Sequence, residues 1–528
     1  MNLPLTPIRF KRRAETEFGK KLGIVCGDVR LTYGEYCERA NRLSNALTEL
    51  GVRQGERVAW LGYNCHRLLE AYYGVVQIGA VLLPLNIRLT PSEIAFILND
   101  SETVALFYDL DFAPIVDALR QQAGTIKKFI PLESTAHTDS SGLDYEQLLA
   151  AASPEFTPVS VADDDLAEIF YTSGTTANPK GVMMTHRNLY LHAMQVMAGL
   201  GIKDSIVQLH TIPLFHVNGW GTPHSVTCIG GRHVVVKKFD PKQVLELVQR
   251  ERVTHFSMVP TMAMALINHP ELRGYDLSSL EFVQIGGAAS PIDLIREVEQ
   301  HMGCPCYAGY GLTETTPVLT VAFLKDHLKN LPDEERWKRQ AMTGYPIPGV
   351  ELSIVDPADN HLPHDGQTPG EIVVRADNVM AGYWKRPEET AEVMRNGWFH
   401  TGDMAVIDEE GYFLIVDRKK DIIISGGENI SSIEVEKAVY SHPAVFECAV
   451  IAIPDDRWGE VPRALVVLKP GEAVSEKDLI DYCRTRLPGF KIPKSVEFFD
   501  SLPKGGTGKI LKKELRERYW RGYEKRVH

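Results

Sequence analysis

Residues 233–259, HVVVKKFDPKQVLELVQRERVTHFSMV, alternate between two local patterns. Residues 233–236 are a short β-branched run, which favours a buried strand. Pro241 then opens the segment 242–252, whose apolar residues recur at helical spacing, and residues 253–259 are strand-like again. A strand, a helix and another strand in succession predict parallel strands with helices packed outside them.

The same alternation continues on both sides of this stretch. Downstream, Pro260 opens another helix, and the strand-like residues 281–287 lead through Pro291 to a helix over 292–302. Upstream, the expected elements are a helix over 31–50, strands over 56–62, 80–85 and 103–109, and a helix over 91–100 with Thr90 as its N-cap. We therefore predict an α/β fold whose large N-terminal region contains two related sheets.

The pattern changes after about residue 345. Short strands separated by Gly, Pro and Asp are expected over 349–356, 370–376 and 412–417, which indicates a β-rich subdomain. A compact α+β pattern follows, with helices over 431–442 and 476–487 and strands over 449–454 and 463–469. We predict an N-terminal domain over residues 1–417, a hinge over 418–421 and a small mobile C-terminal domain over 422–528.

Length, charge and cysteine content limit the class of protein. The 528 residues are enough for two to four folding units, and 44% hydrophobic residues exclude a disordered, collagenous or coiled-coil chain. The formal net charge of −12 argues against a general nucleic-acid binder, which needs a basic face. The eight cysteines contain no CxxC pair, so free thiols are expected and no zinc site.

No segment is predicted to cross a membrane. The N-terminal residues lack the apolar core of a signal peptide. The most apolar run, residues 71–85, is interrupted by Gln77 and Pro84 and is shorter than the roughly 20 residues that a span needs. A buried helix that passes into a strand fits this run better, and we expect a cytoplasmic protein.

The strongest chemical signal is YTSGTTANPKGV, residues 171–182. It follows the apolar residues 166–170, so a strand is expected to end in a loop rich in Gly, Ser and Thr that leads to Lys180. Glycines let a backbone approach a polyphosphate, hydroxyl and amide groups donate to its oxygens, and a lysine adds positive charge. The pattern of a Walker A loop is absent. A mobile linker is the alternative interpretation.

Further motifs accompany this loop in a consistent order: residues 310–316 (YGLTETT), 401–403 (TGD), 417–421 (DRKKD) with 425–429 (SGGEN), and 503–510 (PKGGTGKI). Together with 171–182 they resemble the adenylate-forming superfamily of acyl-CoA synthetases, firefly luciferases and peptide-synthetase adenylation domains. The resemblance covers nearly the whole chain and is closest to bacterial medium- and long-chain fatty acyl-CoA synthetases. Ala177 departs from the usual glycine, which restricts positive φ but removes no donor or charge.

The resemblance implies a reaction in two steps. A carboxylic acid attacks the α-phosphate of MgATP to give an acyl-adenylate and pyrophosphate, and AMP then leaves as the thiol of CoA attacks. Charge builds on the phosphates in the first step, so cations and oriented donors are expected to stabilise it. ATP, Mg²⁺ and CoA are therefore the expected cofactors and substrates, and a homodimer is suggested by the resemblance alone.

The same resemblance assigns the nucleotide contacts. The phosphates are assigned to Thr172, Ser173, Gly174, Thr175, Thr176 and Lys180, with Thr313 at the α-phosphate. Glu314, together with Thr172, is the expected Mg²⁺ ligand, since Mg²⁺ prefers oxygen ligands. Adenine and its surroundings are assigned to Gly287, Ala288, Gly309, Tyr310 and Gly311, and the ribose to Asp403 and Arg418.

Three residues are expected to be catalytic. Lys509, on the mobile C-terminal domain, would bridge the substrate carboxylate and the α-phosphate. Lys420 would lie at the hinge about which that domain rotates after adenylation, and Gly426 and Gly427 would then let pantetheine pass. His216 matches a histidine near the substrate carboxylate, although a histidine among aromatic residues is more often an ordinary core residue.

Two positions bear on the acid. Trp220 matches a tryptophan that gates the acyl tunnel of bacterial fatty acyl-CoA synthetases. Gly311 stands where acetyl-CoA synthetases carry a tryptophan, so we expect room for a longer or wider acyl group. Residues 323–350 resemble medium- and long-chain fatty acyl-CoA synthetases and also methylthiopropionate-CoA ligases, which leaves chain length open.

The leading interpretation is an acyl-CoA synthetase for a medium- or long-chain fatty acid. The alternatives are a ligase for a short, aryl or methylthio-substituted acid, and an acyl-AMP-forming enzyme with an acceptor other than CoA. A peptide-synthetase module would be followed by a carrier domain. The sequence ends at His528, soon after the lysine motif, so no carrier domain is expected. A luciferase-like monooxygenase remains formally open, and a non-catalytic scaffold would be expected to lack residues such as Lys509 and Glu314.

Overall fold

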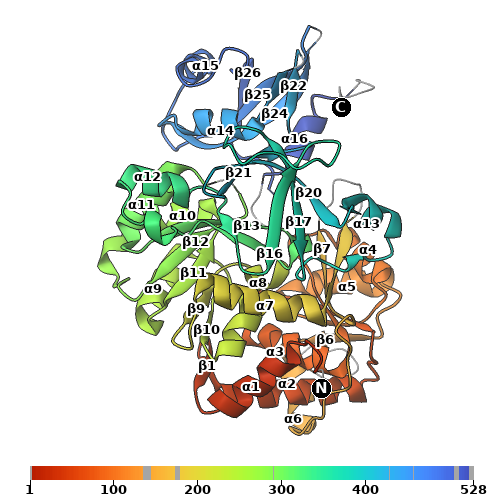
Figure 1. The fold of residues 1–528 in the computed structure, drawn as a ribbon. Helices are drawn as coiled ribbons and strands as arrows, with labels where there is room; N and C mark the ends of the chain where they lie inside the picture. The colour runs from red at the N-terminus through yellow and green to blue at the C-terminus, as the bar shows by residue number, and fades with distance from the viewer. Residues whose placement is uncertain are drawn as a thin grey trace. The chain divides into compact units, whose positions relative to one another are not determined.

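The computed structural model describes residues 3–134, 144–172, 179–288, 290–426, 428–455, 457–504 and 510–521. The fold is α/β, with a large N-terminal domain of sheets and a small C-terminal domain (Figure 1). By contacts the chain forms two compact units, Met1–Glu351 with Arg375–Phe399 and Leu352–Val374 with His400–His528. The hinge at residues 418–421 stays a prediction.

The first sheet of the larger unit has nine strands. In spatial order they are β15 (Tyr345–Pro346), β14 (Val318–Val321), β13 (Cys306–Gly311), β12 (Phe282–Ile285), β11 (His255–Met258), β9 (Val207–His210), β10 (Arg232–Val235), β1 (Leu22–Cys26) and β2 (Val29–Thr32). The strands from β13 to β1 run parallel, and the strands beyond them at both ends are antiparallel. The parallel arrangement predicted from the sequence is confirmed.

Helices cover both faces of this sheet, as parallel strands require. One apolar cluster joins β9, β11 and β12 to α9 (Pro241–Glu251), α10 (Pro260–Ile267) and α11 (Ile292–Met302), which follow one another along the sheet in Figure 1. On the other side lie α8 (Val217–Ile229), α7 (His186–Leu200) and α1 (Ile8–Phe18), and α12 (Asp333–Gln340) packs near α11. The prolines expected at the helix starts are there: Pro241 and Pro260 begin their helices and Pro291 caps α11.

The second sheet of this unit has seven strands. They are β18 (Gly382–Tyr383), β8 (Lys180–Thr185), β7 (Leu166–Thr172), β4 (Val81–Pro84), β3 (Arg57–Leu61), β5 (Thr103–Tyr108) and β6 (Lys128–Pro131). Its helices are α2 (Tyr33–Glu49), α3 (His66–Gly74), α4 (Pro91–Asp100), α5 (Ala113–Gln122) and α6 (Tyr145–Ala151), with α13 (Pro387–Val393) after β18. Thr90 caps α4 as expected, because its hydroxyl accepts from Glu93 N and the Glu93 carboxylate accepts in return.

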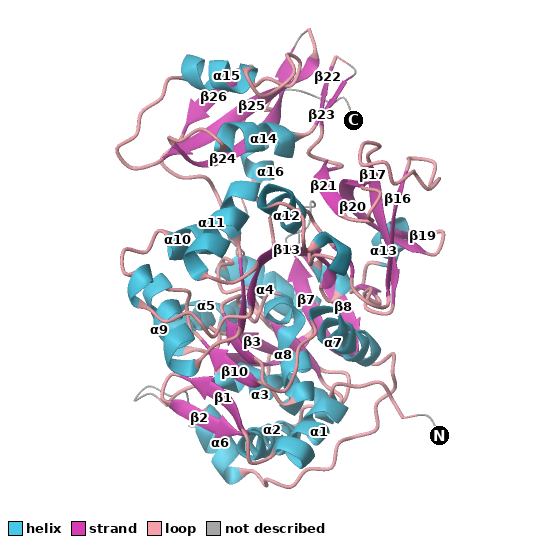
Figure 2. Cartoon of the chain, turned by 60° about the vertical axis from the view of Figure 1, so that its left-hand side comes forward, coloured by secondary structure: helices cyan, strands magenta, loops and turns pink. Residues whose placement is uncertain are grey.

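The β-rich region and the C-terminal region complete the chain. The first contains β16 (Val350–Val355), β17 (Gly370–Ala376), β20 (Trp398–Ile407), β19 (Met394–Arg395) and β21 (Phe413–Arg418). The second contains β23 (Glu428–Ile430), β22 (Ile423–Ser425), β25 (Gly459–Leu468), β24 (Val445–Asp455) and β26 (Ser495–Phe498), with α14 (Ser432–Tyr440), α15 (Glu476–Arg484) and α16 (Lys512–Glu517). In Figure 2 all helices are cyan and all strands magenta, so the strands of these two regions can be followed by their labels.

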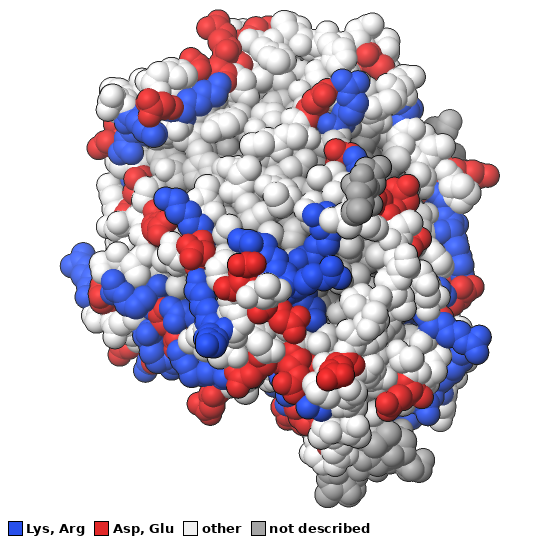
Figure 3. Space-filling model, turned by 60° about the horizontal axis from the view of Figure 1, so that its bottom comes forward, with Lys and Arg blue, Asp and Glu red and all other residues white. Residues whose placement is uncertain are grey.

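The apolar run at residues 71–85 lies in the interior of the larger unit. It forms the end of α3, a short 3₁₀ turn and β4, all buried, as predicted. Among the described residues, no helix is long and apolar enough to cross a membrane. All eight cysteines are free thiols, as expected. On the face shown in Figure 3, basic and acidic side chains are interspersed.

Candidate functional site

The phosphate-loop motif lies in a hairpin of the seven-stranded sheet. β7 and β8 are antiparallel, and Thr172 pairs with Lys180. The loop residues 173–178, which include Ser173, Gly174, Thr175 and Thr176, lie outside the described residues. Thr172 and Lys180 therefore mark the two ends of the predicted phosphate loop, and the expected strand before the loop is confirmed.

Lys180 lies between an acidic and an aromatic side chain. Its ammonium forms an ion pair with Glu389 of α13 and lies 5.2 Å from the ring centre of Tyr383. The Lys180 side chain is 17% exposed, which strengthens its electrostatic interactions relative to a fully solvated lysine. An anionic phosphate that reached this ammonium would compete with the Glu389 carboxylate.

Glu314 contacts the same tyrosine, Tyr383. The Tyr383 hydroxyl donates a 2.9 Å hydrogen bond to Glu314 Oε1, and Met380 N donates 2.8 Å to the Glu314 carbonyl. Burial and the neighbouring Glu314 carboxylate raise the pKa of Tyr383, so its hydroxyl stays protonated. Tyr383 therefore connects the predicted phosphate lysine to the predicted metal ligand, and Thr313, also predicted, is buried beside Glu314.

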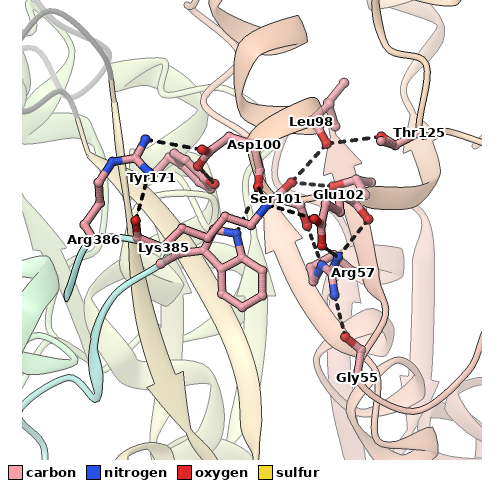
Figure 4. A network of polar contacts seen from close by, with 12 residues as sticks. Gly55, Arg57, Leu98, Asp100, Ser101, Glu102, Thr125, Tyr171, Lys385 and Arg386 are labelled. Atoms are coloured by element: carbon pink, nitrogen blue, oxygen red, sulfur yellow. Dashed lines mark hydrogen bonds and ion pairs between the residues drawn. The ribbon is translucent and has the colours of Figure 1, made fainter.

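A second set of contacts fixes the segment that carries Tyr383 (Figure 4). Asp100, at the end of α4, accepts hydrogen bonds from the Tyr171 hydroxyl at 2.6 Å and from Arg386 at 3.2 Å. Its backbone carbonyl accepts from the Trp384 indole and the Lys385 ammonium, each at 2.9 Å. Asp100 thus holds both the strand that enters the phosphate loop and the segment between β18 and α13.

The remaining predicted nucleotide residues lie at the ends of β12 and β13. Gly287 and Ala288 follow β12, and Gly287 has a φ of +80°, which favours glycine. Gly309, Tyr310 and Gly311 are the last residues of β13, on the neighbouring parallel strand. The carboxyl ends of adjacent parallel strands are where open α/β sheets bind their ligands.

The structure corrects the interpretation of Gly311. A Cβ atom built at this position would lie 1.9 Å from the carbonyl oxygen of Pro317. Backbone therefore occupies the space that a side chain would need, at a register shift in the pairing of β13 with β14. The glycine is required by this close approach, so it does not by itself indicate room for a long acyl group.

His216 and Trp220 lie at a left-handed turn at the start of α8. Residues 217–221 all have positive φ, between +44° and +80°, which is costly for the non-glycine residues among them. The Asn218 amide donates a 2.7 Å hydrogen bond to Glu168, a fully buried carboxylate of β7. The Trp220 ring lies over Gly286, because a Cβ atom built there would be 3.0 Å from it. His216 is half buried and precedes the first residue of the helix, and its side chain makes no capping hydrogen bond.

Asp403 and Arg418 are brought together in the smaller unit. They are cross-strand partners on β20 and β21, and Arg418 Nε lies 3.4 Å from Asp403 Oδ1. Asp403 N donates to Thr401 Oγ1 at 3.1 Å, so the TGD motif forms a local turn within the strand. The Asp403 side chain is buried and that of Arg418 is partly exposed.

The predicted hinge is adjacent to a buried acidic residue. Asp417 accepts hydrogen bonds from Ser432 N at 2.5 Å and Arg418 N at 2.7 Å. Burial raises the pKa of Asp417 to about 6. Lys420 follows at the surface, and its carbonyl accepts from Arg516. The segment after β21 is therefore held at two places. Asp417 holds it before Lys420, and Arg516 of α16 holds it at the Lys420 carbonyl.

The C-terminal motifs are only partly described. Gly426 has a φ of +60°, and a Cβ atom there would lie 2.6 Å from the Trp458 ring. Gly427 and Lys509 lie outside the described residues. Lys504 and Ile510, on either side of the segment that contains Lys509, pair in an isolated antiparallel bridge.

Several residues of the site were not predicted from the sequence. Tyr383 and Glu389 contact the predicted residues Glu314 and Lys180. Asp100 and Glu168 hold Tyr171 and Asn218, which neighbour predicted residues in the chain. The stretch GYWKRPEE, residues 382–389, carries two of them and has the Gly, Pro and charged residues of a turn before a helix, which was the one available signal.

Comparison with known proteins identifies the family. Residues 10–384 match the AMP-binding enzyme family, and residues 434–509 match the AMP-binding enzyme C-terminal domain. A long-chain-fatty-acid–CoA ligase of Thermus thermophilus is 40% identical over 97% of this chain and 95% of its own. A feruloyl-CoA synthase of Amycolatopsis sp is 41% identical over 93% of this chain and 95% of its own.

Solved structures agree with this assignment. The crystal structure of an anthranilate CoA ligase in complex with anthranoyl-AMP superposes with a TM-score of 0.89, at 26% identity, over 98% of both chains. The expected family and fold are therefore confirmed. The chain belongs to the AMP-binding enzyme family, the adenylate-forming superfamily, and is an acid–thiol ligase that uses ATP to join a carboxylic acid to CoA.

Proposed function

We propose that this protein is an acyl-CoA synthetase that activates a medium- or long-chain fatty acid in two half-reactions. In the first, a carboxylate oxygen of the acid attacks the α-phosphorus of ATP, and pyrophosphate leaves. In the second, the CoA thiol attacks the acyl carbon, loses its proton, and AMP leaves. The binding residues must therefore hold ATP in the first half-reaction and the acyl-adenylate in the second.

One observation carries the first half-reaction. Tyr383 contacts both Lys180 and Glu314: the Lys180 ammonium lies 5.2 Å from its ring centre, and its hydroxyl donates to the Glu314 carboxylate. This arrangement suits a polyphosphate that carries a divalent cation. The Lys180 ammonium would contact phosphate oxygens, and the Glu314 carboxylate would bind the cation. We assign Lys180 to the phosphates and Thr172 and Thr313 to positions beside them.

The residues present fit a Mg²⁺ ion that arrives with ATP. Among the described residues there is no cluster of three or more His, Cys, Asp or Glu side chains that would form a protein-only metal site. Mg²⁺ usually binds through one or two carboxylates together with substrate phosphates and water, and Glu314 supplies one such carboxylate. When bound, the ion would neutralise developing charge on the phosphates.

The smaller unit supplies the ribose contacts and the catalytic lysine in this proposal. Asp403, buried and held by Arg418, would accept hydrogen bonds from the ribose hydroxyls. Lys509 would bridge the acid and the α-phosphate during adenylation. Rotation at residues 418–421, with Lys420 in the hinge, would then replace Lys509 by the surface near Gly426 and Gly427, where pantetheine passes.

The acid itself is assigned by similarity. The Thermus thermophilus relative at 40% identity acts on long-chain fatty acids by name, which supports the fatty-acid proposal. An aromatic acid is the second candidate, since the Amycolatopsis relative at 41% identity is named for ferulate. In this proposal His216 lies near the carboxylate of the acid, and Trp220 lies at the entrance to the acyl site.

The test is AMP release by the purified protein with MgATP, CoA and a panel of acids from acetate through octanoate to palmitate, with benzoate, ferulate and methylthiopropionate. CoA-dependent AMP formation with one class of acid is expected. Lys509→Ala should abolish adenylation and keep thioester formation from supplied acyl-AMP, while Lys504→Ala, a nearby lysine paired with Glu447, should change neither. AMP formation that does not depend on CoA would contradict the proposed acceptor.

A further inference from the structure

The left-handed turn at the start of α8 is the most unusual stretch of backbone in the larger unit. Val217, Asn218, Gly219, Trp220 and Gly221 follow one another with φ between +44° and +80°. Left-handed conformations are unfavourable for residues that carry a Cβ atom, and a β-branched residue such as Val217 rarely adopts them. Such a run persists only where the surrounding structure holds it, so its anchors are informative.

A buried carboxylate is the polar anchor of this turn. Glu168 of β7 is fully buried, and its Oε2 accepts a 2.7 Å hydrogen bond from the Asn218 amide. Its other oxygen, Oε1, lies 3.1 Å from Nε2 of His224, a buried residue of α8 beyond the turn. A carboxylate only accepts, so both neighbours donate to it. Glu168 therefore ties the turn and the helix that follows to one strand of the sheet.

Asn218 makes this contact in place of a bond within the turn. Asparagine tolerates the left-handed region, and its side chain commonly bonds to nearby backbone. Here the Asn218 side-chain oxygen has no hydrogen-bond partner among the described residues, while the amide nitrogen donates to Glu168. The side chain therefore serves the connection to β7.

Packing fixes the other end of the turn. A Cβ atom built at Gly286 would lie 3.0 Å from the Trp220 ring, and one built at Gly221 would overlap the His192 ring. Gly286 directly follows β12, so the Trp220 ring lies at the carboxyl end of a parallel strand. The turn thus meets the edge of the sheet where open α/β folds bind ligands, and Glu168 is its anchor on the other side.

We propose that Glu168 is a positioning residue for the carboxylic acid. Through Asn218 it holds residues 217–221 in one arrangement before the acid binds, and it takes no part in the chemistry of either half-reaction. This inference rests on the proposed function, in which His216 and Trp220 contact the acid. Groups that are already in place bind a substrate without the cost of being ordered by it.

The anchor is expected to affect binding of the acid and not of ATP. β7 leads to the phosphate loop at Thr172 and is paired with β8 on one side and with β4 on the other. These backbone pairs keep the strand in place when the Glu168 side chain changes, whereas the turn is not part of a sheet. Without the anchor we expect KM for the acid to rise at least about tenfold, and KM for ATP to change by less than about twofold.

Three variants separate the hydrogen bond from the shape of the turn. Glu168→Met keeps the length of the side chain and removes both acceptors. Asn218→Gly keeps the tolerance of positive φ and removes the donor. Both should raise KM for the acid. Glu168→Gln keeps an acceptor for Asn218 and places an N–H group opposite His224 Nε2, which accepts in its other tautomer. It should restore KM for the acid to within about threefold of the wild type.

Glu70 provides the matched control. It is also fully buried, on α3, and it accepts hydrogen bonds from Arg39 at 2.7 Å and from the Tyr145 hydroxyl at 2.6 Å. Glu70→Met therefore removes a buried carboxylate from its donors in the same unit, but neither donor belongs to the turn. Its KM for the acid should equal that of the wild type.

The measurement is the initial rate of CoA-dependent AMP release with the acid or ATP varied. The acid is whichever of octanoate, palmitate, benzoate and ferulate the wild type turns over fastest. Thermal unfolding shows which variants are folded, and Asn218→Gly carries the test if Glu168→Met is not. The double variant of Glu168→Met and Asn218→Gly should be no worse than the more severe single variant, because both remove the same bond.

The outcomes separate this inference from the function on which it rests. A rise in KM for the acid alone, in Asn218→Gly and in Glu168→Met, supports it. An unchanged KM for the acid in Asn218→Gly, an equal rise in Glu70→Met or a parallel rise in KM for ATP overturns it and leaves the synthetase activity standing. Absence of CoA-dependent AMP release by the wild type with every acid overturns the proposed function and this inference with it.

Discussion

The Tyr383 hydroxyl donates a hydrogen bond to Glu314, and the ring of the same tyrosine lies against the Lys180 ammonium. Tyr383→Phe keeps the ring and removes the hydroxyl. We expect the rate of adenylation to fall about tenfold, because a hydrogen bond to a charged group contributes about 1.5 kcal/mol or more. Pyrophosphate exchange measures this step. Tyr190→Phe, on α7 where the ring stacks on Phe10, is the matched control and should leave the rate unchanged.

Asp100 connects Tyr171 to Arg386, and its side chain is 12% exposed. Asp100→Asn removes the charge that both donors share. We expect the free energy of unfolding to fall by about 1.5–3 kcal/mol and KM for ATP to rise, since the phosphate loop and the Tyr383 segment lose their common anchor. Urea unfolding and initial rates measure the two effects.

The neighbouring Glu102 provides the control for that variant. Its carboxylate pairs with Arg57 and Lys385 but is 55% exposed. Glu102→Gln should change the free energy of unfolding by less than about 1 kcal/mol and leave KM for ATP unchanged. Equal effects of the two variants would contradict a special role of Asp100.

Gly311→Ala tests the structural reason for the glycine. The added methyl group would overlap the Pro317 carbonyl, so we expect a loss of about 2–4 kcal/mol in the free energy of unfolding. Gly124→Ala, where no atom lies near the added methyl group, should be nearly neutral. If the Gly311→Ala variant were as stable as the wild type and accepted only shorter acids, the glycine would instead define the acyl site.

Much of the fold could be predicted from the sequence because its signals are local. The capping box at Thr90, the prolines at helix starts and the apolar strands all act within a few residues, and the structure contains them. The roles of the motif residues were predicted through resemblance and stay predictions. Their neighbours were not, since Asp100 and Trp384 are 284 positions apart in the chain and meet only in the folded sheet.

Two features of the site depend on tertiary packing that the sequence does not show. Gly311 looked like a missing side chain, but the backbone of Pro317 fills that space. The stretch 217–221 gave no sign of its left-handed turn, because Val217 and Trp220 disfavour positive φ in isolation. The turn is held from outside by Glu168, on a different strand. Close approaches and buried anchors of this kind depend on tertiary packing.

The buried Asp417 should make stability depend on pH. Its pKa of about 6 in the folded protein lies above the ordinary value of 3.8, so the unfolded chain loses this proton first as pH rises. The stabilisation that the protonated Asp417 gives to the folded protein is therefore fully present below about pH 4. It is lost as pH rises from about 4 to 6. The loss is of the order of 3 kcal/mol, from about 1.36 kcal/mol for each pKa unit.

Urea unfolding of the wild type and Asp417→Asn from pH 4 to 7 measures this dependence. The difference in unfolding free energy, wild type minus variant, should fall over that range. Asp365, whose pKa is lowered to about 2 by the backbone N–H of Thr368, is the control, and Asp365→Asn should give a constant difference above pH 4. A constant difference for Asp417→Asn as well would contradict the raised pKa.

The ion pair of Lys180 with Glu389 predicts opposite effects of its two partners on ATP binding. Lys180→Met removes the proposed phosphate contact, so KM for ATP should rise and the adenylation rate should fall at least tenfold. Glu389→Gln removes the carboxylate that competes with phosphate. Because the pair is partly exposed, with side chains 17% and 32% accessible, we expect KM for ATP to fall only about two- to fivefold. Initial rates at varied ATP concentration measure both variants. A rise in KM for Glu389→Gln would show instead that the carboxylate holds Lys180 in place for the phosphates.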